Sequence, residues 1–187
     1  LTAPVDTTVV GKEAPMLFMG WRADASKSLQ LDTLEVIAQL LSNGQAGLFD
    51  LDLSQKLKVQ EVSAGIADMD EYSVFYVYGQ PKSGQTLQEV RSLALSEIEK
   101  LKKGNFSDDL LPSIVNNYKR YYYTQLDNNQ FRAKQYVDAF INHKDWKQEV
   151  DKLNRISKLT KAEIVKFANQ FFRNDFACVY KEQGNDT

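Results

Sequence analysis

LLSNGQAGLFDLDLSQKL, residues 40–57, is the stretch that decides the fold. Apolar residues at helical spacing lead into it and predict a helix capped by Ser28. Gly44 is expected to end that helix in a left-handed conformation, because it has no Cβ to clash. After Gly47 the leucines again fall near helical spacing, which predicts a second, short helix. The stretch therefore predicts a helix–turn–helix corner that leads directly into a strand.

Four further segments outside this corner read as strands. Residues 59–66 alternate in polarity, and residues 72–79 are apolar or aromatic on both faces, so the second strand is expected in an interior position. A turn at residues 68–71 makes the two a plausible antiparallel hairpin. Short apolar runs at residues 15–21 and 176–180 predict two more buried strands. The polar residues 22–27 are expected to form a loop.

The rest of the chain is mostly helical in pattern. Two capping boxes, Thr86 with Glu89 and Thr160 with Glu163, mark helix starts, because each pair can satisfy the other's free backbone amides. Ser107 is expected to cap a further helix after a stop at Gly104. Apolar spacing predicts additional helices that carry Phe131 to Ile141 and Trp146 to Ile156. Paired antiparallel strands with helices gathered on one side give an α+β layer fold.

The length and composition of the chain indicate a single domain. The 187 residues fit a lead-in strand or linker at 1–12, a single α+β domain at 13–181 and a polar tail at 182–187. The net charge of −2 gives no bulk attraction for nucleic acid or an anionic membrane. No apolar run approaches the roughly 20 residues that span a bilayer. The chain begins at Leu1 rather than Met, so we expect a fragment or a processed product.

The order of elements around residues 40–57 resembles the non-catalytic repeat domain of the M16 zinc peptidases. The resemblance covers Glu13 to Lys181 and rests on the helix ending in Asn-Gly, the Gly-containing turn, Leu-Phe, the Leu-x-x-x-Leu helix and the strand after it. It implies an M16-like fold, a parent protein that is a zinc metalloendopeptidase, and partners that are other M16 domains of the same chain or a homologous subunit. Family resemblance alone also implies a bacterial cell envelope or periplasm.

A catalytic site of this family needs two histidines and a glutamate on one helix, plus a distal glutamate. This chain has one histidine, His143, and one cysteine, Cys178, so no convincing site with three zinc ligands can be assembled. His143 is expected at the surface, and Cys178 is expected to be a small core residue of the last strand. We therefore expect no cofactor in this domain and zinc in the parent protein's catalytic domain.

The resemblance also directs attention to two substituted positions. In active M16 enzymes a later domain supplies an arginine in the helix after the Gly turn and, seven residues on, a tyrosine at the start of the next strand. Those positions fall at about Ser54 and Glu61 in this sequence. Serine cannot clamp a carbonyl with a cationic fork, and glutamate would repel developing negative charge. The domain is therefore expected to be a partner that walls the substrate chamber and binds peptide, without completing a catalytic site.

Three alternatives stand beside this interpretation. The run Tyr118 to Tyr123 mixes basic and aromatic residues, which could stack nucleic-acid bases. A half-buried helix face shared by Tyr118, Tyr121 and Tyr122 fits the acidic chain better. The same fold could serve a structural or assembly subunit without a proteolytic role, or the element order could belong to an unrelated α+β binding domain. A His-x-x-Glu-His upstream of Leu1 would favour the peptidase.

Overall fold

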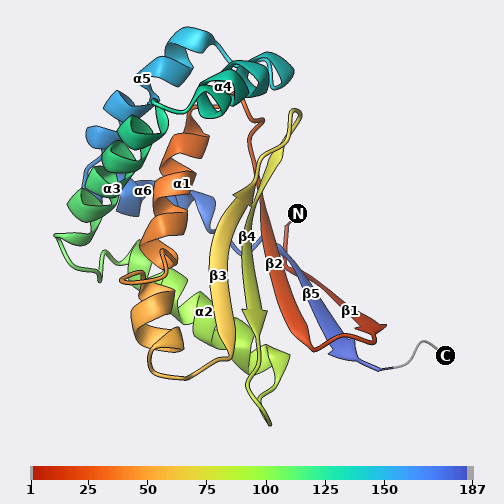
Figure 1. The fold of residues 1–187 in the computed structure, drawn as a ribbon. Coiled ribbons are helices and arrows are strands. Elements are labelled where there is room, and N and C mark those ends of the chain that lie inside the picture. Colours follow the sequence, from red (N-terminus) through yellow and green to blue (C-terminus); the bar gives the residue numbers. More distant parts are fainter. Residues whose placement is uncertain (1, 185–187) are drawn as a thin grey trace.

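The computed structural model describes residues 2–184, which form a five-stranded sheet with helices on one face (Figure 1). The strand order is β1-β5-β2-β4-β3. Only the β1–β5 pair is parallel, and the other three pairs are antiparallel. The strands are β1 Val5–Gly11, β2 Met16–Ala23, β3 Glu61–Ala67, β4 Ser73–Gln80 and β5 Ala177–Gln183. The hairpin of β3 with β4 and the interior position of β4 are both confirmed.

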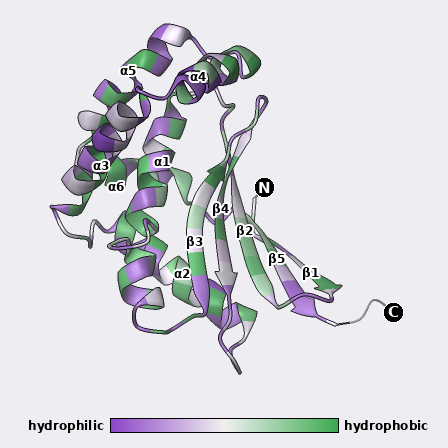
Figure 2. Ribbon diagram, viewed as in Figure 1, coloured by the Kyte–Doolittle hydropathy of each residue, from purple (hydrophilic) through white to green (hydrophobic). Residues whose placement is uncertain are grey.

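All the helices lie on the same side of the sheet (Figure 1), which confirms the predicted α+β fold with helices gathered on one side. They are α1 Gln30–Leu41, the short π-helix η1 Asp50–Ser54, α2 Leu87–Lys102, α3 Leu110–Gln125, α4 Asn129–Ile141, α5 Trp146–Ser157 and α6 Lys161–Phe171. The core fills the space between this layer and the sheet, and its fully buried members include Met19, Ile37 and Phe75. In Figure 2 apolar residues recur along the strands and the helices that face them.

The sheet extends beyond the four segments whose apolar patterns predicted strands, and at residues 5–11 it takes the strand alternative. Residues 5–11, expected as a lead-in strand or linker, form the edge strand β1. It pairs over its whole length with β5, from Val5 opposite Ala177 to Gly11 opposite Gln183. β5 thus continues beyond Lys181 into the segment expected to be a polar tail, whose residues 185–187 lie outside the described residues. The loop expected at residues 22–27 begins later, because Arg22 and Ala23 still belong to β2.

Local capping signals located two of the helix starts correctly. In both capping boxes the threonine side chain accepts the backbone N–H of the glutamate, and the glutamate side chain accepts the backbone N–H of the threonine. The prediction for Ser107 was wrong. Its hydroxyl accepts the Asp109 N–H at 3.3 Å in a preceding turn, and α3 itself begins at Leu110. Asp109, the residue before α3, makes no side-chain cap hydrogen bond, and the Leu110 N–H donates to the Ser107 carbonyl oxygen at 3.2 Å.

The corner at residues 42–54 is held by two side chains that the prediction did not use. Gly44 has φ +81°, which confirms the left-handed conformation, but α1 ends at Leu41, ahead of the predicted position. The Asn43 side-chain oxygen accepts the N–H groups of Gln45 and Ala46 at 3.0 and 2.9 Å. The buried carboxylate of Asp50 accepts the N–H groups of Asn43 and Gly47 at 2.8 and 3.0 Å. The second helix is a single π-type turn.

Candidate functional site

The face of the sheet that the helices leave uncovered is the candidate site. Along β4 every second residue is buried against the helices, and the residues between them are half-buried on the open face. β2 alternates in the same way, with Phe18 and Arg22 exposed. The register places Phe18 opposite Tyr78 and Arg22 opposite Val74, so outward side chains of the two strands are neighbours. This face therefore offers a mixed aromatic and aliphatic surface with one strong cation.

Aromatic rings make the centre of the open face flat. Phe18 and Tyr76 stack with centroids 5.2 Å apart and planes 17° apart. The Tyr76 ring lies over Gly65 of β3, where an added Cβ would come within 2.6 Å of the tyrosine oxygen. Gly20, opposite Tyr76 in the register, makes room for Val74 instead, because a Cβ there would lie 3.1 Å from Val74 Cγ1. The absence of a side chain at Gly65 thus allows the Tyr76 ring to lie along the sheet.

A groove of about 1,110 Å³ opens where β2 runs past β5. The pairing of these strands ends at Gly20 opposite Ala177, and β2 continues to Ala23. The groove extends from open-face residues to the end of α6 and the segment after it, and its lining includes Phe18, Val74, Val179, Gln170, Phe171 and Arg173. The Trp21 indole N–H donates to the Arg173 carbonyl at 3.2 Å and fixes that segment against the sheet. The volume is sufficient for several side chains of a peptide.

Two arginines and two aspartates line this groove. Arg173 pairs with Asp175 at 2.9 Å. Asp24 accepts a hydrogen bond from the Ser28 hydroxyl at 3.1 Å. The Arg22 guanidinium carbon lies 4.6 Å from the centroid of the Tyr72 ring, a cation–π contact. No carboxylate among residues 2–184 lies within 4.0 Å of the Arg22 guanidinium nitrogens.

Ser54 and Glu61, the substituted positions that the resemblance marked, lie away from the groove. Ser54 is the last residue of η1 and is half-buried. Glu61 is the exposed first residue of β3 and pairs with Gln80. Neither residue lines the groove. Their assignment to the substrate-contacting positions of active enzymes stays a prediction.

His143 and Cys178 occupy separate parts of the molecule. His143 is exposed in the turn between α4 and α5 with φ +51°, as expected for a surface residue. Cys178 is a fully buried, free cysteine of β5, and burial raises the pKa of its thiol. Within the described residues 2–184, no three His, Cys, Asp or Glu side chains gather where they could hold a metal ion.

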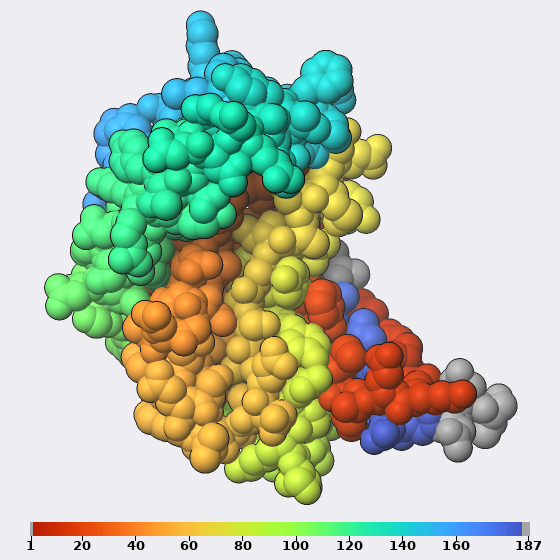
Figure 3. Space-filling view, viewed as in Figure 1, coloured from red at the N-terminus to blue at the C-terminus, as the bar shows by residue number. Residues whose placement is uncertain are grey.

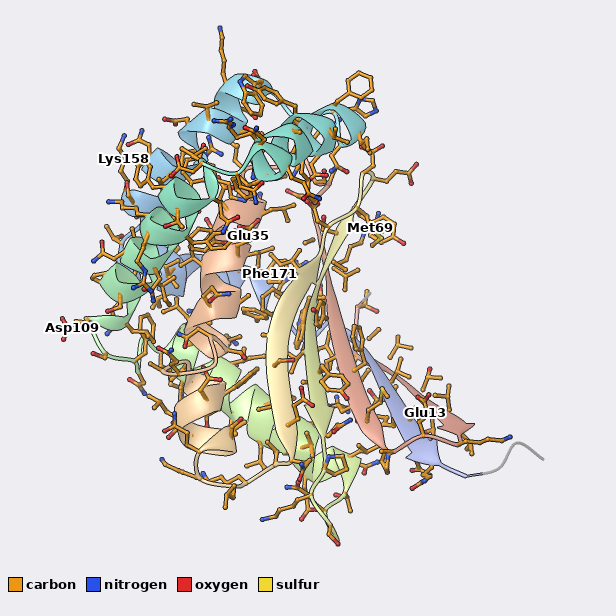
Figure 4. The ribbon with its side chains drawn as sticks, in the orientation of Figure 1. Glu13, Glu35, Met69, Asp109, Lys158 and Phe171 are labelled. Carbon is orange, nitrogen blue, oxygen red and sulfur yellow. The ribbon has the colours of Figure 1, made fainter. Side chains whose placement is uncertain are left out.

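The tyrosine run of α3 is only partly buried. Tyr118 donates to Glu35 at 2.7 Å, and burial together with this carboxylate raises its pKa. Lys152 of α5 also donates to Glu35 at 2.7 Å, so α1, α3 and α5 meet at the carboxylate labelled in Figure 4. Tyr121 is 59% exposed, so the prediction of a shared half-buried face is wrong for this residue. Only Tyr118 and Tyr122 are half-buried.

A second cavity of about 410 Å³ lies between α3, α4 and α5 and reaches Asp68 at the end of the β3–β4 hairpin. Figure 3 shows the molecule hollowed beneath α4. Lys144 pairs with Asp68 at 3.0 Å, and Lys134 pairs with Asp138 on α4. Phe140 of α4 is 83% exposed, so the apolar residues of this helix do not all face the core. The basic and acidic side chains of this cavity largely neutralise one another.

Comparison with known families identifies the chain. The family model described as "Peptidase M16 inactive domain" matches residues 2–118. The chain belongs to the M16 peptidase family, as its inactive domain. This agrees with the resemblance drawn from residues 40–57 and with the fold.

Three solved structures share the fold of this chain. A protease from Helicobacter pylori superposes with a TM-score of 0.90 at 18% identity, over 97% of this chain and 45% of that chain. The inactive peptidase domain of a Bordetella parapertussis protein described as a zinc protease gives 0.78 at 14% identity, over 91% of this chain and 93% of that one. The periplasmic protease PqqL from Escherichia coli gives 0.72 at 13% identity, over 98% and 21%.

The inactive M16 domain therefore spans less than half of the Helicobacter and Escherichia chains but nearly all of the Bordetella chain. A search by sequence among curated proteins gave no match. Among the described residues, no helix has the length and apolar character needed to cross a bilayer.

Proposed function

We propose that this M16 inactive domain is the non-catalytic partner of a zinc peptidase domain and helps to enclose an unfolded peptide for cleavage. The observation that carries the proposal is the open face of the sheet. It presents the Phe18–Tyr76 stack and the groove beside it. Apolar side chains on a sheet are more stable when another layer covers them than when they face solvent, so an uncovered face of this kind indicates a binding surface. A companion domain that faces this sheet across a chamber leaves the surface free for peptide.

The edges of the sheet offer a second mode of contact with an extended chain. β1 and β3 are the two outer strands, and no other strand among residues 2–184 pairs with their free edges. Edge strands bind extended peptides through main-chain hydrogen bonds, which carry little sequence preference. Such binding suits a domain that holds many different unfolded substrates.

Zinc and the general-base glutamate belong, in this proposal, to a catalytic domain of the same chain or of a homologous subunit. The two residues that could offer soft or nitrogen ligands here, His143 and Cys178, lie in an exposed turn and in the buried sheet. The Escherichia relative is a periplasmic protease, and we extend a cell-envelope location to this chain as part of the proposal.

Peptide binding to matched variants tests the function. Fluorescence anisotropy of labelled, reduced insulin B chain would be measured against the wild-type domain, Phe18→Ser and Phe140→Ser. Phe18 is in the stack on the open face, whereas Phe140 is an exposed phenylalanine of α4. We expect Phe18→Ser to weaken binding about tenfold, since losing a partly buried phenylalanine contact costs roughly 1.4 kcal/mol.

Phe140→Ser should bind the peptide as the wild type does. Equal weakening by both substitutions would contradict the assignment of the open face. No binding by the wild-type domain, together with a stable complex with its companion domain, would instead favour a structural or assembly role.

A further inference from the structure

We propose that Arg22 binds a carboxylate of the peptide held on the open face, so that this domain favours acidic segments or free carboxyl ends. The inference rests on the proposed function and adds a chemical preference to it. Arg22 is the strong cation at the end of an aromatic surface, and its side chain points away from the helical layer.

The Tyr72 ring holds the guanidinium in place. Tyr72 directly precedes β4, and Arg22 pairs with Val74 in the register, so strand pairing brings the two side chains together. The guanidinium carbon lies over the ring, 4.6 Å from its centroid. A guanidinium that binds an aromatic ring through its face keeps its N–H edges free for a planar, bidentate acceptor.

The donors of Arg22 have no acceptor within residues 2–184, where no hydrogen bond from its side chain is made. The other charged groups of the groove have partners. Arg173 pairs with Asp175, and the Asp24 carboxylate accepts a hydrogen bond from the neutral Ser28 hydroxyl and so keeps its negative charge. A ligand entering the groove therefore meets one unpaired cation beside the apolar side chains of Phe18 and Val74.

This combination favours a carboxylate on a peptide over a polyanion. One free guanidinium binds one carboxylate, whereas a nucleic acid needs several cations in a row, and the chain carries a net charge of −2. The apolar neighbours of Arg22 bind the side chains and backbone that flank the carboxylate. The carboxylate can come from the peptide's C-terminus or from an Asp or Glu side chain, since both present the same acceptor pair.

Three labelled peptides separate these sources in an anisotropy assay. The first is a peptide of Val, Thr and Tyr residues with a free C-terminus, the second is its C-terminal amide, and the third is the amide with one internal Thr replaced by Glu. Each is measured against the wild-type domain, Arg22→Gln, and the control Arg120→Gln. Arg120 is an exposed arginine of α3, on the helical layer.

We expect the wild-type domain to bind a carboxylate-bearing peptide about fivefold more tightly than the neutral amide, the upper range of a partly exposed ion pair. Arg22→Gln should bind the carboxylate peptides and the amide equally, with the affinity for the amide unchanged. Arg120→Gln should keep the ratio, and added salt should reduce it in the wild type. Tyr72→Leu should reduce the ratio partially, because the ring only positions the guanidinium.

The two proposals fail in different ways. If the amide and the carboxylate peptides bind the wild type equally, or if Arg22→Gln keeps the ratio, the carboxylate assignment is overturned while peptide binding to the open face stands. If none of the three peptides binds, the proposed function fails and takes this inference with it. A ratio seen only with the free C-terminus, or only with Glu, identifies the source of the carboxylate.

Discussion

Gly47 is the residue on which the helix–turn–helix corner depends most. A Cβ added there would lie 2.5 Å from the Leu41 carbonyl oxygen and 2.7 Å from its carbon, both backbone atoms that cannot move aside cheaply. It would also lie 2.8 Å from the Asp50 carboxylate oxygen that accepts two backbone N–H groups. Gly47→Ala should therefore combine overpacking, about 1–3 kcal/mol, with weakened hydrogen bonds to a buried carboxylate, about 1 kcal/mol.

Gly44 provides the comparison, since it adopts φ +81° with no atom within 4 Å of an added Cβ. Gly44→Ala and Gly44→Val should each cost about 1–2 kcal/mol from left-handed backbone strain, with valine at the upper end. Urea unfolding followed by tryptophan fluorescence, to which the buried Trp21 contributes, measures the free energies of unfolding. We expect Gly47→Ala to lose about 3 kcal/mol and more than Gly44→Ala. A neutral Gly47→Ala would refute the geometry of the corner.

The remaining predictions concern catalysis, the substituted positions and acid stability. The purified domain, without a His-tag, should hold no stoichiometric zinc and should not cleave insulin B chain with or without added zinc; chelator-sensitive turnover that co-purifies with it would contradict this. The double substitution Ser54→Arg with Glu61→Tyr should change the free energy of unfolding by less than about 1 kcal/mol in urea titrations, because Ser54 is half-buried and Glu61 is exposed. Hydrogen bonds from Lys100 and Lys56 lower the pKa of Asp52 from 3.8 to about 2. A carboxyl group with a lowered folded-state pKa stabilises the fold above pH 4 and loses that contribution as the pH falls towards 2. The wild type should thus lose more stability between pH 4 and pH 2 than Asp52→Asn, and equal losses in thermal unfolding would contradict the ion pairs.

Local features were predictable from sequence because the residues that make them are close in the chain. Both capping boxes formed, since Thr86 and Thr160 each lie three residues before their glutamate. The left-handed Gly44 followed from its place after an apolar helix. Asp50 was missed, although it lies in the same corner. Its burial depends on how the π-type turn of η1 returns towards Asn43, which no helical spacing specifies.

Non-local features were the ones that sequence did not specify. Pairing of Val5 with Ala177 joins residues far apart in the chain, so β1 read only as extended backbone. Helical spacing located α4 but did not indicate that Phe140 would face solvent. The contact of Arg22 with Tyr72 depends on the register of β2 with β4. One signal was available, because the alternation of Phe18, Gly20 and Arg22 continues the outward face of the strand.

Hydrogen exchange with and without an unfolded peptide tests the central claim most directly. Reduced insulin B chain at saturating concentration would be added to the wild-type domain, and the backbone amides of β2, β3 and β4 compared with those of α3 and α4. The account predicts slower exchange at the β2 residues near Phe18 and along the free edge of β3, with the two helices unchanged. Protection confined to α3 and α4, with the strands unchanged, would contradict the claim that the open face of the sheet holds the peptide.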